Sequence, residues 1–194
     1  MDKIYHLLND SEIKECQIKQ YKKGEAIFFE GERCAYIGIL IKGELRIVSF
    51  LEDGSEVTYN TIIPGMMFGN NLIFSDEPIY RGDVISDQNS KVILIKKEIL
   101  IKILQTNKEF LIAYLNQQSN FGKDLNLKIK LLTFKNAVDR INYYFAINYN
   151  KIEYKSISDL ARRLYLTREV LSRTLHQMEK DEKIIIRAKS IVKI

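Results

Sequence analysis

The sequence has 194 residues, of which 46% are hydrophobic and 28% are charged, and its formal net charge is +5. This length suits one large or two small domains, and the apolar content is sufficient for real hydrophobic cores. The sequence contains neither an apolar run long enough to cross a membrane nor a signal-peptide pattern. We therefore expect a soluble, cytoplasmic protein without a membrane partner.

Residues that commonly bind metals are scarce. The sequence has two cysteines, Cys16 and Cys34, and two histidines, His6 and His176. These numbers are too small for a disulfide framework, a four-thiolate iron–sulfur cluster or a histidine-rich metal site. We therefore expect no metal and no cofactor. Ordinary structural roles are favoured for both thiols, with redox sensing as the weaker alternative.

The N-terminal half contains many short apolar runs separated by turn signals. Residues 1–20 are expected to form a short helical lead-in. Six runs then follow: Ala26–Phe29, Tyr36–Ile41, Leu45–Phe50, Val57–Ile63, Val84–Ile85 and Val92–Ile95. Asp53-Gly54 between two of them is a strong hairpin signal. Short strands spaced about ten residues apart indicate an antiparallel sandwich or barrel.

Such a roll could also house a metal-dependent enzyme. That chemistry needs several histidines and a carboxylate that converge on one metal ion. The region from Gly24 to Ile95 contains no histidine. We therefore predict no catalytic residues and no enzyme activity.

A long helix is predicted after the roll. Lys97–Gln105 is typical of a short helix, and Thr106-Asn107-Lys108-Glu109 has the capping-box form that opens a longer one. Residues spaced alternately by four and three follow, and we call them the seam: Leu111, Leu115, Gln118, Gly122, Leu125, Ile129 and Leu132. This heptad pattern fits a coiled coil, but three repeats are few, so periodicity alone slightly favours a helix packed on its own domain.

Positive charge is concentrated in the last third of the chain. Residues 134–194 contain 13 Lys/Arg and 7 Asp/Glu, a net charge of +6, which leaves −1 for the first 133 residues. Phosphate-backbone binding favours this distribution because neutralised phosphates release counterions. A solvated basic surface without a ligand explains the charge equally well.

Two short helices with a tight join are predicted between Lys155 and Lys183. The candidate N-caps are Ser156 and Thr167, and Ser156 with Asp159 three residues later has the capping-box form. Tyr165-Leu166 lies between the helices. The second helix directs four residues away from its apolar stripe: Arg168, Glu169, Ser172 and Arg173. This arrangement is typical of a helix-turn-helix, whose second helix meets base edges in the major groove of DNA.

The exposed residue types suit base recognition. Arg can donate to guanine O6 and N7, and Glu can accept from cytosine N4, which gives about 1–3 kcal/mol of discrimination for each good pair. An amphipathic helical hairpin with a solvated face is the alternative. The two caps, the short join and the order of these residues favour the helix-turn-helix.

At these residues the sequence resembles a known family. Thr-Arg-Glu-Val-Leu-Ser-Arg from Thr167 to Arg173 resembles the recognition helix of the Crp/Fnr family, the cyclic-AMP-receptor and fumarate-nitrate regulators of transcription. The resemblance implies that Arg168, Glu169 and Arg173 read a G-T-G-A-like half-site. Tyr165 departs from the pattern, because this turn usually contains Gly.

The resemblance implies an α+β fold with three regions. These are an N-terminal antiparallel β jelly roll of the cyclic-nucleotide-binding type over residues 1–106, a dimerisation helix over 107–133 and a C-terminal winged helix-turn-helix over 134–194. The wing would comprise Ile184–Arg187 and Ser190–Ile194. The candidate contacts to DNA phosphates are Ser156, Thr167, Arg187 and Lys189.

The resemblance also locates a degraded effector pocket. Members that bind cyclic AMP have a Glu for the ribose hydroxyl and an Arg-Ser pair for the phosphate. This sequence keeps Gly69 but has Asn70 at the Glu position and Asn71 beside it, and Arg81 comes one or two positions late. An amide cannot supply the charged acceptor that strengthens a ribose contact. An effector other than cyclic AMP is therefore expected.

The prediction is a homodimeric regulator that binds a pseudo-palindromic DNA operator and responds to a small-molecule effector of unknown identity. The resemblance adds RNA polymerase as a candidate partner. Two alternatives remain: a sensor of an anion or nucleotide-like ligand that acts through protein partners, and a constitutive regulator that needs no ligand.

Overall fold

The computed structural model describes residues 3–194. The chain divides within one long helix into two compact units, one extending to Asn120 and the other from Phe121 to Ile194. Each unit has its own cluster of buried apolar side chains. No helix within residues 3–194 is long and apolar enough to cross a lipid bilayer.

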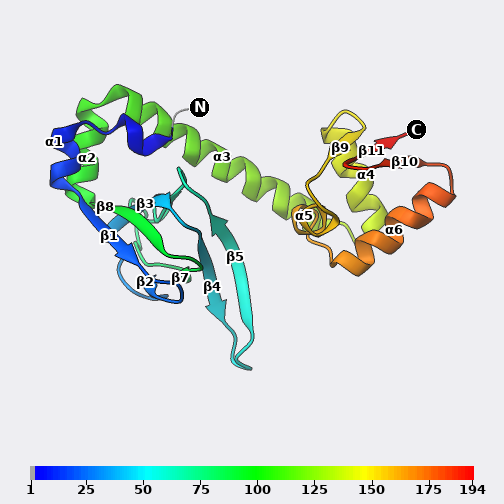
Figure 1. Cartoon of the computed structure of the whole chain (residues 1–194), viewed down its shortest axis with the longest axis horizontal. Helices are drawn as coiled ribbons and strands as arrows, with labels where there is room; N and C mark the ends of the chain where they lie inside the picture. Colours follow the sequence, from blue (N-terminus) through cyan, green and yellow to red (C-terminus); the bar gives the residue numbers. More distant parts are fainter. Residues whose placement is uncertain (1–2) are drawn as a thin grey trace. The chain divides into compact units, whose positions relative to one another are not determined.

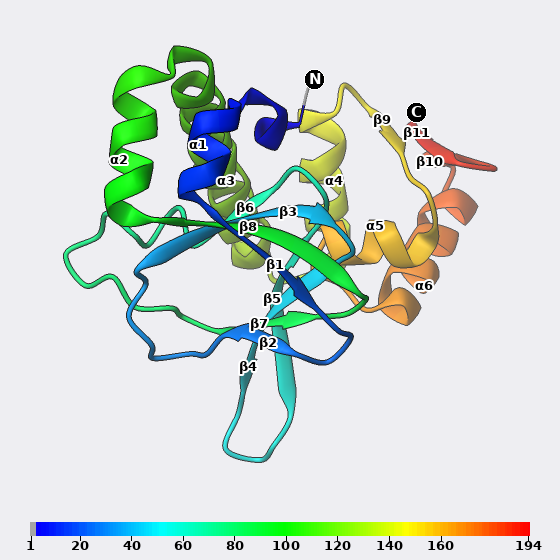
Figure 2. The same ribbon diagram turned by 60° about the vertical axis from the view of Figure 1, so that its left-hand side comes forward.

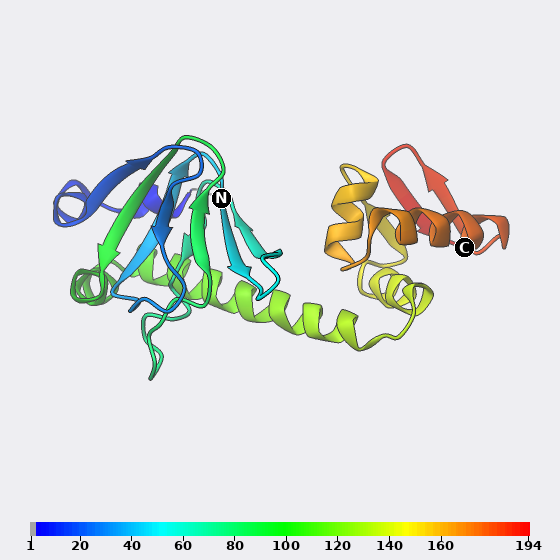
Figure 3. The ribbon, with the colours of Figure 1, turned by 90° about the horizontal axis from the view of Figure 1, so that it is seen from below.

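The first unit contains a β-roll (Figure 3). Its strands are β1 (Gln17–Tyr21), β2 (Ala26–Phe28), β3 (Tyr36–Lys42), β4 (Leu45–Phe50), β5 (Glu56–Ile62), β6 (Met67–Phe68), β7 (Asp83–Ser86) and β8 (Ser90–Lys96). They form two antiparallel sheets, with strand orders β1-β8-β3-β6 and β2-β7-β4-β5. Leu40 and Val92 of one sheet pack in the same buried cluster as Leu45 and Val84 of the other. The predicted antiparallel roll is confirmed.

The hairpin between β4 and β5 is the one that Asp53-Gly54 predicts. Gly54 has a φ of 80°, a left-handed conformation that side chains with a Cβ rarely adopt. The Asp53 carboxylate accepts a hydrogen bond from the Ser55 amide at 2.8 Å. These two residues therefore fix the reversal of the chain through local chemistry.

Helices cover one end of the roll (Figure 2). They are the 3-10 helix η1 (Ile4–Leu7), α1 (Asp10–Glu15), α2 (Lys97–Thr106) and the first half of α3 (Lys108–Thr133). The Glu12 carboxylate accepts from the Asn9 amide at 2.8 Å and from Asn107 Nδ2 at 3.0 Å. This buried acid thus joins α1 to the start of α3.

The predicted cap of α3 is one residue too early. The Asn107 side chain accepts from the Phe110 amide at 3.0 Å and is therefore the residue that caps the helix. Thr106 ends α2, and its hydroxyl donates to the Lys102 carbonyl at 2.9 Å. Asn107 and Thr106 both suit an N-cap, so the sequence pattern could not choose between them.

The expected helical lead-in is only partly correct. Residues 1 and 2 lie outside the described residues, and η1 and α1 are short. Gln17–Tyr21 is the strand β1, which pairs with β8 at the edge of its sheet. Four of its five residues are exposed, so it lacks the apolar alternation of a half-buried strand.

The second unit has the fold of a winged helix-turn-helix (Figure 1). It contains the second half of α3, then α4 (Ala137–Ile147), β9 (Lys151–Glu153), α5 (Ile157–Arg163), α6 (Arg168–Lys180), β10 (Ile184–Arg187) and β11 (Ser190–Lys193). The two predicted wing strands are confirmed, and the additional strand β9 pairs with β11. Its core includes Leu131, Ile141, Phe145, Leu160, Leu164, Leu171, Leu175, Met178, Ile184 and Ile191.

The end of α6 provides a simple test of backbone strain. The Glu182 and Lys183 amides donate to the carbonyls of Glu179 and Met178, both at 3.0 Å, which is a Schellman motif. Glu182 is the left-handed residue of this motif, with a φ of 57° and an exposed side chain. Glycine is the usual residue there because it has no Cβ to strain the backbone.

Replacing Glu182 with Gly should raise the free energy of unfolding by about 1 kcal/mol, because the strain of a left-handed non-glycine residue is removed. Chemical denaturation followed by circular dichroism measures this change. Glu182→Ala is the matched control, since it removes the same carboxylate but keeps the Cβ. Equal stabilisation by Ala and Gly would contradict the explanation.

Candidate nucleic-acid interface

Helix α6 is fixed in the second unit by its cap and its apolar face. The Thr167 hydroxyl accepts from the Val170 amide at 3.2 Å, as predicted for the N-cap. Leu171, Leu175 and Met178 are each at most 2% exposed, so one face of the helix is fully packed. The opposite face is thereby directed away from the core.

The four predicted base-reading residues lie on that outer face. Arg168, Glu169, Ser172 and Arg173 are all exposed. No side chain of these four forms an ion pair or hydrogen bond with another residue of the described range 3–194. Their donors and acceptors are therefore directed to solvent, as they must be in order to meet an external partner.

The start of α5 differs in one detail from the predicted capping box. The Ser156 hydroxyl accepts from the Asp159 amide at 3.1 Å, so Ser156 is the N-cap. The Asp159 carboxylate does not complete the box. It lies 3.2 Å from Arg162 and 3.4 Å from Arg163 instead. Two basic residues in the last turn of the helix compete for this carboxylate, which the local pattern of Ser and Asp does not reveal.

The turn between α5 and α6 has the predicted departure from glycine. Tyr165 has a φ of 53°. The Tyr165 and Leu166 amides donate to the carbonyls of Arg162 and Ala161 at 3.2 and 3.0 Å. The turn is therefore a Schellman motif with Tyr in the left-handed position.

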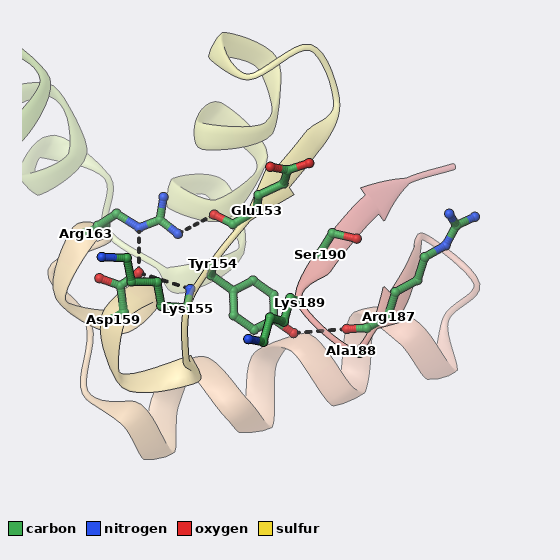
Figure 4. Close-up of a pocket in the computed structure, with 9 residues that line it drawn as sticks. All are labelled: Glu153, Tyr154, Lys155, Asp159, Arg163, Arg187, Ala188, Lys189 and Ser190. Carbon is green, nitrogen blue, oxygen red and sulfur yellow. Dashed lines mark hydrogen bonds and ion pairs between the residues drawn. The ribbon is translucent and has the colours of Figure 1, made fainter. Parts of the chain in front are cut away.

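A cavity of about 760 Å³ lies between α5 and the wing (Figure 4). It is lined by Glu153, Tyr154, Lys155, Asp159, Arg163, Arg187, Ala188, Lys189 and Ser190. Four of these residues are basic and two are acidic, so the lining has an excess of positive charge. Arg187 and Lys189, predicted to contact phosphates, are exposed at its wing side.

Lys155 and Arg163 are the basic lining residues that the sequence analysis did not identify. Arg163 Nη2 donates to the Glu153 carbonyl at 2.6 Å, and its Nε lies 3.4 Å from Asp159 (Figure 4). Arg163 and Arg187 are separated by 24 positions in the chain, so no local pattern relates them. Pairing of β9 with β11 brings the two segments together.

The predicted seam on α3 is only partly exposed. Four of its residues are exposed by 44–54%: Leu115, Leu125, Ile129 and Leu132. Leu111 and Gly122 are half-buried, and an added Cβ on Gly122 would meet no atom within 4 Å. Ile112 and Phe121 are exposed as well, by 50% and 41%, although the heptad pattern omits them.

Gln118 does not behave as an outward-facing seam residue. Its Oε1 accepts from Asn70 Nδ2 at 2.6 Å, and its Nε2 donates to the Asn70 carbonyl at 3.0 Å. The Tyr114 hydroxyl donates to the same carbonyl at 2.9 Å. Gln118 therefore joins α3 to the roll of its own chain, a contact that heptad spacing cannot reveal.

The predicted effector-pocket residues differ in their burial. Gly69 and Asn70 are buried, and Asn70 is bonded to Gln118 as described above. Asn71 and Arg81 are exposed, and Arg81 forms only an exposed ion pair of 3.6 Å with Glu77. The expected effector pocket at these four residues stays a prediction.

An aromatic side chain occupies the interior beside Arg81. Tyr80 is 2% exposed, donates its hydroxyl to the Tyr36 carbonyl at 2.7 Å and stacks on Phe28 with ring centroids 4.3 Å apart. Burial raises the pKa of Tyr80, so the hydroxyl stays protonated. A neutral aromatic ring cannot replace a guanidinium as a partner for a phosphate.

The two thiols lack the properties of redox sensors. Burial, assisted by the charges of Glu12 and Glu15, raises the pKa of Cys16 to about 11. Burial also raises the pKa of Cys34. Both groups are therefore protonated at neutral pH, and the thiol is far less reactive than the thiolate. Within residues 3–194, no three metal-binding side chains gather in one place.

Comparisons with known proteins agree with this architecture. Residues 18–107 match the model of the cyclic nucleotide-binding domain. The HTH-type transcriptional regulator ArcR of Staphylococcus haemolyticus is 21% identical over 91% of this chain and 82% of its own length. The catabolite activator protein of Thermus thermophilus is 18% identical, with a TM-score of 0.58 over 100% of this chain and 94% of the other. A CooA variant of Carboxydothermus hydrogenoformans is 15% identical, with a TM-score of 0.68 over 100% and 91%.

The chain combines a roll of the cyclic nucleotide-binding type with a long helix and a winged helix-turn-helix. The domain model covers the roll, and the matches to ArcR and to the Thermus protein extend over 91% and 100% of this chain. The chain therefore shares the fold of these proteins, and its residues 18–107 match the cyclic nucleotide-binding domain.

Proposed function

We propose that two copies of this chain bind a pseudo-palindromic DNA operator and read its bases with α6. The observation that carries this proposal is the exposed row Arg168, Glu169, Ser172 and Arg173, whose polar groups have no partner among residues 3–194. The residues Ser156, Thr167, Arg187 and Lys189 would then contact phosphates. Such contacts fix the register of the protein on the duplex, and base contacts supply the specificity.

The charges around the wing support a duplex as the partner. The cavity at the wing is lined by Lys155, Arg163, Arg187 and Lys189, and Lys155, Arg187 and Lys189 are exposed. Cations at this density release counterions from DNA, so operator affinity should fall steeply as salt rises. A regulator that acts through proteins alone would not need this charge.

The exposed apolar residues of α3 support a homodimer. In this proposal residues 1–106 sense an effector, residues 107–133 pair the two copies, and residues 134–194 bind DNA. Leu115, Leu125, Ile129 and Leu132 would meet their equivalents across a two-fold axis. Two-fold symmetry requires half-sites about 34 Å apart on one side of the duplex.

Selecting bound duplexes from a random pool tests the function directly. The proposal predicts enrichment of one inverted repeat, with half-site centres separated by about one helical turn. The selection is run with and without a metabolite extract, which also tests for an effector. If every sequence is recovered equally under both conditions, specific DNA recognition by this chain is wrong.

We further propose that cyclic AMP is not the effector. Three observations support this: Asn70 is bonded to Gln118, Tyr80 fills the interior beside Arg81, and Arg81 is exposed. A ribose hydroxyl would have to displace Gln118 without gaining a charged acceptor. A constitutive regulator agrees with the same three observations.

Calorimetric titration of the protein with cyclic AMP should therefore give no binding heat at micromolar concentrations. The operator affinity should also be the same with and without cyclic AMP. Micromolar affinity for cyclic AMP would contradict this part of the proposal and leave the proposed DNA recognition unchanged.

A further inference from the structure

The turn that precedes α6 is strained, and two of its carbonyl groups need a partner from outside α5. Tyr165 occupies the left-handed position that favours glycine, with a φ of 53°. The carbonyl groups of Leu164 and Tyr165 follow the last turn of α5, so they have no partner within that helix. A turn of this kind keeps its shape only when surrounding groups support it.

Arg140 of α4 supplies that support. Its Nη1 donates to the Tyr165 carbonyl at 2.6 Å and to the Leu164 carbonyl at 3.2 Å. Its Nη2 donates to the Phe134 carbonyl at 3.2 Å. Phe134 follows the last residue of α3, so one guanidinium joins the end of α3 to the turn. The rigid, planar fork of donors in Arg suits this bridge, and the single ammonium of Lys does not reproduce it.

One donor of the Arg140 guanidinium, its Nε, is buried without a hydrogen bond within the described residues, so burial by itself does not favour this position. An unsatisfied buried donor is unfavourable. The guanidinium is therefore held by its three bonds to carbonyl groups, in spite of the donor that remains unpaired.

The side chain of Tyr165 provides a second connection to α3. Lys128 Nζ lies 5.2 Å from the centre of the Tyr165 ring, within the range of a cation–π contact. Burial first, and then the charge of Asp124, raise the pKa of Tyr165. Lys128 and Asp124 both lie on α3, so the ring rests against the C-terminal half of that helix.

We propose that Arg140 and Tyr165 are positioning residues for base reading, which fix the direction of α6 against the C-terminal half of α3. This inference rests on the proposed function, because it concerns how the reading residues are placed. Thr167 caps α6 two positions after Tyr165, and Arg168 follows directly, so little free chain separates the supported turn from the reading residues.

The test compares Arg140→Lys with the matched control Arg162→Lys, which makes the same substitution at an exposed site on α5. The affinity of each variant is measured for the selected operator and for the same duplex with one changed base pair. Arg140→Lys should reduce the ratio of these affinities about tenfold, because misplaced donors lose part of the discrimination of a bidentate pair. Affinity for the changed duplex should stay the same, since the charge is kept.

Hydrogen exchange of the free protein gives a second readout that requires no DNA. The amides of Tyr165 and Leu166 should exchange faster in Arg140→Lys, while that of Phe145 in the α4 core should not change. Tyr165→Gly covers the case in which Arg140→Lys does not fold. It relieves the strain of the turn but removes the ring from Lys128, so it should fold and still lose operator preference.

The outcomes separate this proposal from the proposed function. A wild-type protein without any operator preference would refute both. If the wild type discriminates and the Arg140→Lys and Tyr165→Gly variants do so equally well, the positioning role is wrong and DNA recognition stands. An equal loss of affinity for both duplexes would indicate general destabilisation and would likewise refute the positioning role.

Discussion

Replacing Arg173 with Ala should lower operator affinity by about 1–3 kcal/mol and relax the choice of base at one position in each half-site. The guanidinium is exposed on the outer face of α6 and has no partner within residues 3–194, so its removal should leave the fold intact. The loss arises because a bidentate pair with guanine O6 and N7 disappears. Fluorescence anisotropy on duplexes changed at one base pair at a time measures both effects.

Lys180→Ala is the matched control for this prediction. Lys180 is also an exposed cation, but it lies in the last turn of the same helix, away from the reading residues. Its loss should leave the base preference at every position unchanged. If Arg173→Ala weakened binding to all duplexes by the same factor, Arg173 would be a phosphate contact and not a reader of bases.

Replacing Ile129 with Asp should separate the two copies. Ile129 is 54% exposed on α3, among the apolar residues that would pair the helices. A charge buried without a partner typically costs about 3–5 kcal/mol, and the symmetric interface would contain two of them. We therefore expect a monomer by sedimentation velocity, and loss of cooperative binding to the full operator.

Asn120→Asp adds the same charge on the opposite face of α3 and serves as the control for Ile129→Asp. Asn120 is exposed, and the periodicity of the helix directs it away from Ile129. This variant should remain a dimer. If both variants were dimers, the apolar face of α3 would not be the pairing surface.

The sequence predicts those features of the fold whose signals are local. The glycine turns and alternating runs locate the strands of the roll, and Thr167 and Ser156 mark the starts of both helices of the helix-turn-helix. The outward direction of Arg173 also follows from helical periodicity alone. These features depend on residues within one or two turns of one another, so a single sequence contains the necessary information.

Features that depend on contacts between distant segments could not be predicted in this way. Strand β1 is polar because it lies at the edge of its sheet, so its sequence lacks apolar alternation. Gln118 matches a heptad seam but contacts Asn70, which is 48 positions away. Arg140 and Tyr165 are similarly joined across 25 positions. In each case the partner is decided by tertiary packing.

The central claim is that Arg173 on α6 reads a guanine. The most direct test is a double-mutant cycle across the protein–DNA interface, which combines Arg173→Ala with a changed base. Each guanine of the selected operator is replaced in turn with 7-deazaguanine, a base without the N7 acceptor. For one guanine per half-site, the wild type should lose affinity while Arg173→Ala should not, which gives a coupling energy of about 1 kcal/mol or more. Equal losses in the wild type and the variant at every guanine would contradict the claim.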